Sequence, residues 1–228
     1  MSDQQNITRI RAVYNALRDL AAEVVFVGGA TVSLYSDRET TEVRPTDDVD
    51  VLVEIYTRSD YVRIEESLRA AGFEHDKASG ILCRFVVQGI TVDVMPIEAS
   101  VLGFTNMWYA DGYRHAVELQ LDDLYTVRIF SAPYFIASKL EAFKGRGKGD
   151  GRTSHDFEDI VYVLNNRSTV WEEMAHAPET VMEYLKSEME TLLANPYLSE
   201  WIGAHLEFSE QSRTLLIVER LKQFVLTS

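Results

Sequence analysis

Apolar and polar residues follow two different periods along the chain. Apolar residues recur at the three- and four-residue spacing of an amphipathic helix over residues 7–22 and 59–73. Between and after these helices, short apolar or alternating runs have the length and the β-branched content of strands. These runs lie at residues 24–27, 47–55, 81–88, 90–95 and 125–130. Strands that are interrupted by helices indicate an α/β domain with a mixed sheet.

The pattern becomes helical from Pro133 almost to the end of the chain. Four helices are predicted there, near residues 132–144, 154–165, 178–193 and 209–226. We therefore expect an α/β (α+β) core over 1–130, with a mixed β-sheet flanked by helices, and a helical C-terminal domain over 131–228. The tract from 98 to 123 is rich in aromatic residues. Two roles are open for them, packing in the core or forming the rim of a site for a nucleotide base.

The composition is that of a globular protein. The chain has 228 residues, 46% of them hydrophobic and 25% charged, enough for one large core or two small ones. No apolar run approaches the roughly 20 residues that span a bilayer, and the chain starts with a polar, amphipathic stretch rather than a signal peptide. We expect a cytoplasmic protein with no membrane partner. The single cysteine, Cys83, is interpreted as a small core residue.

The net charge limits the partners. A formal charge of −14 and a pI near 4.8 disfavour broad contact with a nucleic-acid backbone, which is bound by many lysine and arginine residues. No DNA partner is expected, and any polynucleotide must be met locally. The segment KGRGKGDGR, residues 144–152, gathers four of the 22 basic residues among four glycines, which disfavour a stable helix. It is either a local contact for such a partner or a solvated loop.

Three aspartates lie on predicted strands. Asp48 and Asp50 are two residues apart, so their side chains emerge on the same face of a strand, whereas Asp47 faces away. Asp93 is flanked by two valines on another strand, where a carboxylate needs a cation or another partner. Carboxylates that converge from neighbouring strands hold one or two Mg²⁺ (or Mn²⁺) ions, which stabilise an in-line attack on phosphorus. A D-x-D pair alone carries little weight, because such a pair is frequent at a polar strand edge.

A glycine pair lies upstream of these aspartates. Gly28 and Gly29 end the run VVFV, and ATVSLYS after them has the pattern of a helix start. Backbone N–H groups at such a strand, glycine turn and helix receive phosphate oxygens, although a glycine pair alone often serves only as a turn. Together with the three aspartates, the pair indicates a site that binds a nucleoside triphosphate (NTP).

The segments VGGATVSLY, RPTDDVDVLV and TVDVMP resemble the signature of polymerase-beta-type nucleotidyltransferases. The resemblance implies a nucleotidyltransferase-type fold for the core, with Asp48, Asp50 and Asp93 as catalytic and metal-binding residues. It implies that Gly28 and Gly29 bind the nucleotide, and Asp93 is also the expected proton acceptor for an attacking hydroxyl.

The spacing R-x-T-x-D-h-D is similar to the first motif of AbiEii-type toxin nucleotidyltransferases. It places Arg44 and Thr46 in the nucleotide site. This family commonly has G-S after the first strand, where the chain has two glycines. The resemblance therefore implies that a hydroxyl contact to phosphate is absent or comes from Thr31.

The helical half resembles the same family. APYFIASKLEAFKGR and SHDFEDIVYVL match its lysine-bearing helix and its later D-x-x-D helix, so the resemblance spans residues 26 to about 165. It implies that Lys139 contacts the triphosphate, that Arg146 assists, and that Asp156 and Asp159 belong to the nucleotide site. The residues themselves leave another role open, because two aspartates three apart on one helix face can hold Lys139 and Arg146 by ion pairing.

The predicted activity is metal-dependent transfer of a nucleoside monophosphate from an NTP to an acceptor. The resemblance implies a tRNA 3′ end or a protein as acceptor, and a toxin with a cognate antitoxin in a toxin–antitoxin or phage-defence system. A small-molecule nucleotidyltransferase of the antibiotic-modifying (aminoglycoside-like) kind is the alternative, since an acidic surface suits cationic substrates. A third reading is a non-catalytic nucleotide-binding module, which the presence of all three carboxylates disfavours.

Overall fold

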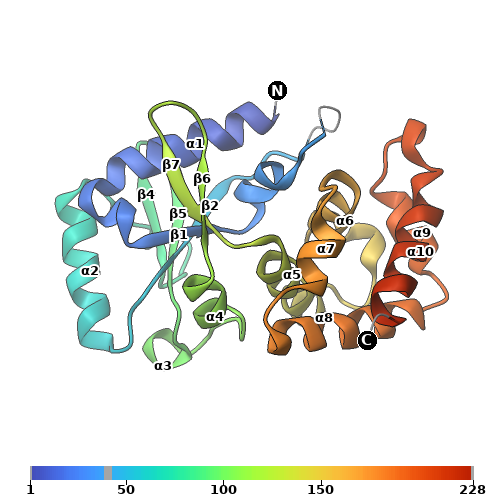
Figure 1. The fold of residues 1–228 in the computed structure, drawn as a ribbon. Coiled ribbons are helices and arrows are strands. Elements are labelled where there is room, and N and C mark those ends of the chain that lie inside the picture. The colour runs from blue at the N-terminus through green and yellow to red at the C-terminus, as the bar shows by residue number, and fades with distance from the viewer. Residues whose placement is uncertain (1, 39–42, 227–228) are drawn as a thin grey trace. The chain divides into compact units, whose positions relative to one another are not determined.

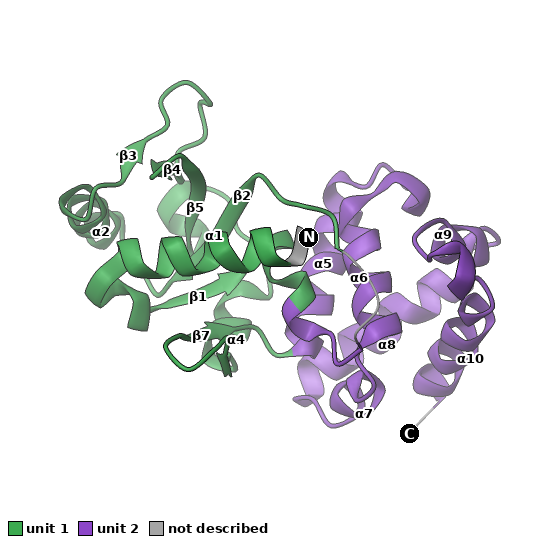
Figure 2. Cartoon of the chain, turned by 90° about the horizontal axis from the view of Figure 1, so that it is seen from above, with its two compact units in different colours: residues 1–33, 42–131 green, residues 34–41, 132–228 purple. Residues whose placement is uncertain are grey.

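The computed structural model describes residues 2–38 and 43–226 (Figure 1). The chain divides into two compact units, which Figure 2 colours separately. Unit 1 comprises residues 1–33 and 42–131, and unit 2 comprises residues 34–41 and 132–228. Unit 1 holds the sheet, and unit 2 is helical.

Within the described residues of unit 1, seven strands form one mixed sheet in the order β3-β4-β5-β2-β1-β7-β6. β2 runs parallel to β5, and β1 runs parallel to β7, while the other neighbours are antiparallel. The strands are β1 (Val24–Val27), β2 (Asp48–Val53), β3 (Glu74–His75), β4 (Arg84–Val87), β5 (Ile90–Pro96), β6 (Val117–Gln120) and β7 (Thr126–Ile129). The expected α/β class with a mixed sheet is confirmed, and β3 and β6 are strands that the sequence pattern did not predict.

The two faces of β2 differ in burial. Val49 and Val51 are fully buried, as are Val92 and Val94 on the neighbouring β5. The alternate positions of β2 carry the aspartates, which are only half-buried. One face of these strands therefore builds the core, and the other presents carboxylates up to Asp50, after which Leu52 is fully buried.

The first predicted helix consists of two elements. α1 (Ser2–Leu17) is an α-helix, and η1 (Arg18–Ala22) continues as a 3-10 helix. The break falls at Arg18, whose φ of 54° lies in the left-handed region. The prediction of one helix over 7–22 is wrong at its C-terminal end for this reason. α1 packs on β2 and β5 with Ile10 and Val13 fully buried.

Four further helical elements lie in the described part of unit 1 or lead out of it. They are η2 (Gly29–Tyr35), α2 (Arg58–Ala70), α3 (Ala99–Leu102) and α4 (Tyr109–Arg114). η2 is a 3-10 helix, so the α-helix that the pattern predicted after the glycine pair is replaced by a tighter turn. In the tract 98–123, Trp108 and Tyr113 are buried, which confirms core packing for part of its aromatic residues. Contact of this tract with a base stays a prediction.

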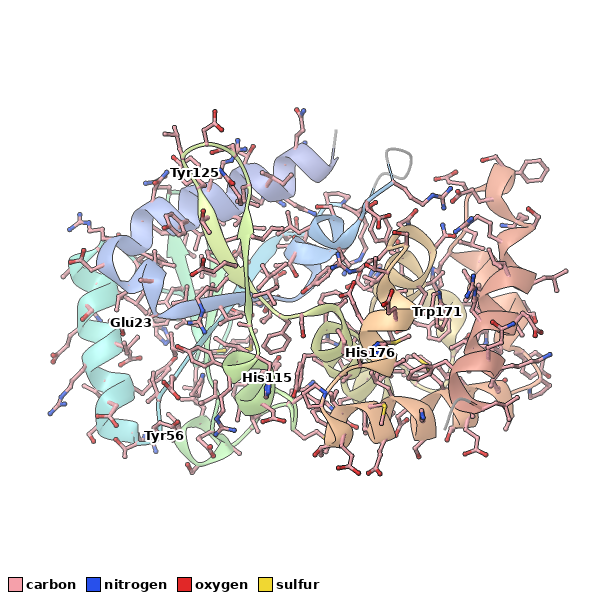
Figure 3. All side chains as sticks on the ribbon, viewed as in Figure 1. Glu23, Tyr56, His115, Tyr125, Trp171 and His176 are labelled. Atoms are coloured by element: carbon pink, nitrogen blue, oxygen red, sulfur yellow. The ribbon has the colours of Figure 1, made fainter. Side chains whose placement is uncertain are left out.

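The β6–β7 hairpin is tied to α1 by an aromatic contact. Tyr125, labelled in Figure 3, packs edge-on against Tyr14 at a centroid distance of 5.9 Å. Its hydroxyl accepts a hydrogen bond from Asn15 at 2.8 Å. These contacts connect the edge of the sheet to the helix that covers its centre.

Unit 2 contains the predicted helices and further short ones. It consists of α5 (Ala132–Arg146), η3 (Gly151–Thr153), α6 (His155–Asn166), α7 (Val170–Ala175), α8 (Glu179–Leu193), α9 (Leu198–Ala204), η4 (Phe208–Glu210) and α10 (Arg213–Leu226). Phe143, Phe157 and Trp201 form an aromatic cluster with centroid distances of 5.2 to 5.9 Å. In the described ranges, no helix combines the length and the apolar character needed to cross a membrane.

A short segment of the N-terminal half belongs to unit 2. The ring of Tyr35 packs against Phe135 at a centroid distance of 4.4 Å, and Tyr35 is 2% exposed. Asp37 accepts hydrogen bonds from the backbone and the hydroxyl of Ser168. Arg38 forms an ion pair with Glu210 at 2.8 Å. The helices of unit 2 thus pack on a segment that precedes them by about one hundred residues in the sequence.

Candidate functional site

The three strand aspartates lie on two neighbouring strands. Asp50 of β2 is the register partner of Asp93 on the parallel strand β5, so both side chains emerge on the same face. Asp48 lies two residues before Asp50 on that face. We call Asp48, Asp50 and Asp93 the carboxylate row. Asp47 is exposed and precedes the strand, in agreement with its expected outward direction.

An arginine that the sequence reading did not single out contacts this row. Arg84 of β4 is the register partner of Asp93. Its Nε donates to Asp93 Oδ1 at 2.8 Å, and its Nη2 donates to Asp93 Oδ2 at 2.7 Å. Nη2 also lies 3.3 Å from Asp48 Oδ2. The hydrogen bonds to Asp93 raise the pKa of Arg84 above its ordinary value, which keeps the guanidinium charged.

The donor atoms of the carboxylate row suit a divalent cation, but their present arrangement does not form a ligand set. Among the residues that the structure describes, no group of three or more His, Cys, Asp or Glu side chains is placed to hold a metal ion. Arg84 instead engages both oxygens of Asp93 and one of Asp48. Carboxylate oxygens on one face are the ligands that Mg²⁺ and Mn²⁺ prefer. The chemistry of these donor atoms therefore fits a metal ion, which would have to share the oxygens with the guanidinium or displace it.

Gly28 makes room for Asp50. The end of β1 is paired antiparallel with β2, so that Val27 is the register partner of Asp50. A Cβ atom on Gly28 would lie 1.9 Å from Asp50 Oδ2, and the φ of Gly28 is +74°. The glycine is thus required by both the backbone conformation and the approach of the carboxylate.

Replacement of Gly28 by alanine is expected to destabilise unit 1 by about 2–3 kcal/mol, because the substitution adds backbone strain and displaces Asp50. The matched control is Gly89→Ala, since Gly89 has a φ of +78° but open space around its Cβ position. The control is expected to cost about 1 kcal/mol from strain alone. Urea unfolding of both variants measures the difference, and equal losses would contradict the proposed contact with Asp50.

Gly29 lies against the residues of the R-x-T-x-D-h-D motif. A Cβ atom on Gly29 would be 2.8 Å from Arg44 Nη2 and 2.8 Å from Thr46 Cγ2. Thr46 is buried, and its backbone N–H donates to Asn6 Oδ1 at 3.2 Å. Asn6 also donates to the carbonyl oxygen of Arg44 at 3.3 Å. The structure thus brings the glycine pair and this motif together, with α1 anchoring the motif.

Asn6 is a second residue that sequence reasoning missed. It is fully buried on α1, four residues before Ile10, which lies on the apolar stripe of that helix. A polar side chain at a buried position must find partners, and Asn6 finds them in the loop of Arg44 and Thr46. The sequence indicated this residue only through its spacing, because Asn6 falls on the same helical period as the apolar residues of α1.

Thr31 has a local partner. The residue is fully buried, and its hydroxyl donates to the carbonyl oxygen of Gly28 at 2.9 Å. This bond stabilises the glycine turn. Contact between the Thr31 hydroxyl and a phosphate stays a prediction.

In unit 2, four charged residues on α5 and α6 form one network. Lys139 Nζ lies 3.2 Å from Asp156 Oδ1 and 2.6 Å from Asp159 Oδ2, and all three side chains are at most 7% exposed. Arg146 donates to both oxygens of Asp156 at 2.6 and 2.8 Å, while its own side chain is 74% exposed. The ion pairing that the spacing of the two aspartates left open is confirmed. Contact of these residues with a triphosphate stays a prediction.

Acid is expected to weaken this network through Asp156. Burial alone would raise the pKa of its carboxyl, but the hydrogen bonds from Arg146 and the charge of Lys139 hold the pKa below its ordinary value of 3.8. A pKa that is lower in the folded than in the unfolded protein stabilises the fold above the ordinary value, and this stabilisation is lost as the pH falls toward the folded-state pKa. As the pH falls below about 5 and through 3.8, the free energy of unfolding should therefore decrease more steeply for the wild type than for Asp156→Asn. Urea titrations at each pH test this, and parallel curves would argue against it.

The basic glycine segment, residues 144–152, is partly helical. α5 continues to Arg146, so the expectation that the segment disfavours a helix is wrong for its first three residues. Cations near a helix C-terminus are favourable, and Lys144 is held by Glu141 and Glu188 at 2.8 and 2.7 Å. Arg152 pairs with Asp150 and Glu200. Much of the positive charge of this segment is thus matched within unit 2.

The fold and the site together define a class of protein. A mixed sheet that brings a glycine turn against one carboxylate of a D-x-D strand, and pairs this carboxylate with a third on the parallel neighbour, is typical of nucleotidyltransferases. The model of the family described as "Nucleotidyl transferase AbiEii toxin, Type IV TA system" matches residues 11–223. The chain therefore belongs to the AbiEii family of nucleotidyl transferase toxins, which confirms the resemblance seen in its motifs. The comparison with curated proteins found no match.

Proposed function

We propose that the chain is a metal-dependent toxin that transfers a nucleoside monophosphate from an NTP to an acceptor, either a tRNA 3′ end or a protein side chain. The observation that carries this proposal is the juxtaposition of the glycine turn with the carboxylate row, in which Gly28 leaves just enough space for Asp50. Membership in a type IV toxin–antitoxin family supports the toxin role and an antitoxin partner.

The proposed chemistry assigns a task to each part of the site. Asp48, Asp50 and Asp93 would hold Mg²⁺ or Mn²⁺, which neutralises charge that develops on the transferring phosphate. Backbone N–H groups of the turn at Gly28 and Gly29 bind phosphate oxygens. Asp93 would accept the proton of the acceptor hydroxyl through a lone pair that its two hydrogen bonds to Arg84 leave available.

In the same proposal, Lys139 and Arg146 are assigned to the triphosphate. Lys139 is oriented by two buried carboxylates, so its ammonium group has a fixed position. Arg146 is the more exposed of the two cations and presents a planar guanidinium, which suits phosphate oxygens. Asp156 orients both.

The test is incubation of the purified protein with each α-labelled NTP, Mg²⁺ and either total RNA or cell extract. A variant with Asp48→Ala and Asp50→Ala serves as the inactive control. Label in RNA or protein with the wild type alone is the expected result, and it identifies the acceptor class. NTP binding without transfer of label to any acceptor would favour a non-catalytic module instead.

A second candidate is transfer to a cationic small molecule. The formal charge of −14 favours it, because acidic surfaces attract aminoglycoside-like acceptors. The same assay with a panel of aminoglycosides separates the candidates, since label would then appear in a small molecule rather than in RNA or protein.

A further inference from the structure

Arg84 occupies the atoms that a metal ion would use. Asp93 has two carboxylate oxygens, and each accepts a hydrogen bond from a different nitrogen of Arg84. The second contact of Nη2 reaches Asp48 across β5, so one guanidinium spans both ends of the carboxylate row. A divalent cation that binds Asp93 must therefore share these oxygens with the guanidinium or displace it.

Burial explains why an arginine lies there. The side chain of Asp93 is 12% exposed and that of Arg84 is 23% exposed. A carboxylate so far removed from water requires a positive partner, and without one it would be strongly unfavourable. The strand register supplies the partner, because β4 places Arg84 directly opposite Asp93.

Charge gives the expected consequence. Arg84 places a positive charge against Asp48 and Asp93, so it weakens the attraction of the row for a divalent cation. The opposing effect, a direct role of Arg84 in supporting the metal ligands, would require that Asp93 keep its contact with Arg84 when the metal binds. Such a shared contact would hold the guanidinium close to the metal ion, and the repulsion between these two positive charges argues against that support.

We propose that Arg84 is an internal counter-ion of the carboxylate row, which stabilises the metal-free site and competes with Mg²⁺ or Mn²⁺ for Asp93 and Asp48. This inference rests on the proposed metal-dependent function. Arg84 acts as a positioning residue that sets the metal affinity, and it does so through the carboxylates.

The test is direct titration of the full chain with Mn²⁺, with free Mn²⁺ measured by electron paramagnetic resonance. Arg84→Gln removes the charge, and Arg63→Gln is the matched control, because Arg63 on α2 is 81% exposed and pairs only loosely with Asp60 at 3.8 Å. Arg84→Gln is expected to bind Mn²⁺ at least about tenfold more tightly than the wild type, and Arg63→Gln as the wild type does. The double variant Arg84→Gln, Asp93→Asn should lose the gain.

Arg84→Lys keeps the charge but not the two-pronged geometry, and it is expected to show an intermediate affinity. It also serves if Arg84→Gln does not fold. Any of three results overturns the proposal. They are unchanged or weaker Mn²⁺ binding in a folded Arg84 variant, a gain in affinity that persists in the variant without Asp93, and no Mn²⁺ binding by any of the proteins. If the wild type transfers label but the Arg84 variants bind Mn²⁺ as the wild type does, only the counter-ion role of Arg84 is rejected. If the Arg84 variants bind Mn²⁺ more tightly but no label is transferred, only the enzymatic function is rejected.

Discussion

Replacing Asp50 by asparagine is expected to lower the rate of nucleotidyl transfer about 10³-fold, equivalent to roughly 4 kcal/mol of transition-state stabilisation. Asparagine has nearly the same shape, so the close fit over Gly28 is kept, but the charge that attracts a divalent cation is lost. The measurement is the initial rate of pyrophosphate release with the acceptor found in the labelling assay, at saturating Mg²⁺.

Asp47 provides the matched control for that experiment. It is the residue before β2, is exposed, and does not share the face of the carboxylate row. Asp47→Asn is therefore expected to keep nearly the full rate. If Asp50→Asn were as active as Asp47→Asn, the carboxylate row would not be the catalytic centre.

The largest effect on stability is expected in unit 2. Asp159→Asn removes one of two carboxylates from Lys139, and both side chains are almost completely buried. A buried ammonium that loses a partner is expected to cost about 3–5 kcal/mol of unfolding free energy. Urea unfolding monitored by tryptophan fluorescence measures the loss, because Trp201 packs against the helices that carry the ion pair.

The neighbouring residue separates this effect from a general change of charge on α6. Glu158 pairs with His155 at the surface, with 33% of its side chain exposed. Glu158→Gln removes the same charge and is expected to change the free energy of unfolding by less than about 0.5 kcal/mol. A similarly small change for Asp159→Asn would show that the buried pair contributes little to the stability of unit 2.

The sequence predicted the part of the site that depends on local pattern. Alternation along the strands placed Asp48 and Asp50 on one face, and the glycine pair marked the strand end that lies beside them. Arg84 depends instead on the register between β4 and β5, which is a tertiary property. The signal in the sequence was Arg84 itself, a charged residue within the apolar run ILCRFVV that precedes the strand of Asp93.

The same distinction holds for the fold. The longer helices were predictable because their apolar periods extend over several turns, whereas α7 and α9 have only six and seven residues. β6 is mostly exposed, so it lacks the apolar alternation that identified the other strands. The end of the α-helix before Arg18 results from one left-handed residue that is not a glycine, and no pattern of hydrophobicity records such a residue.

Tyr35, Asp37 and Arg38 precede the helices of unit 2 in the sequence but pack with them. This placement limits how the gene can recombine with related genes. A gene fragment that begins at residue 132 would encode the helices without the ring that packs on Phe135 and without the arginine that pairs with Glu210. Exchange of the C-terminal half between related genes would therefore join helices to a foreign version of this packing segment. We therefore expect residues 34–38 and the helices that they contact to evolve together. Substitutions on one side of each contact should be accompanied by substitutions on the other side.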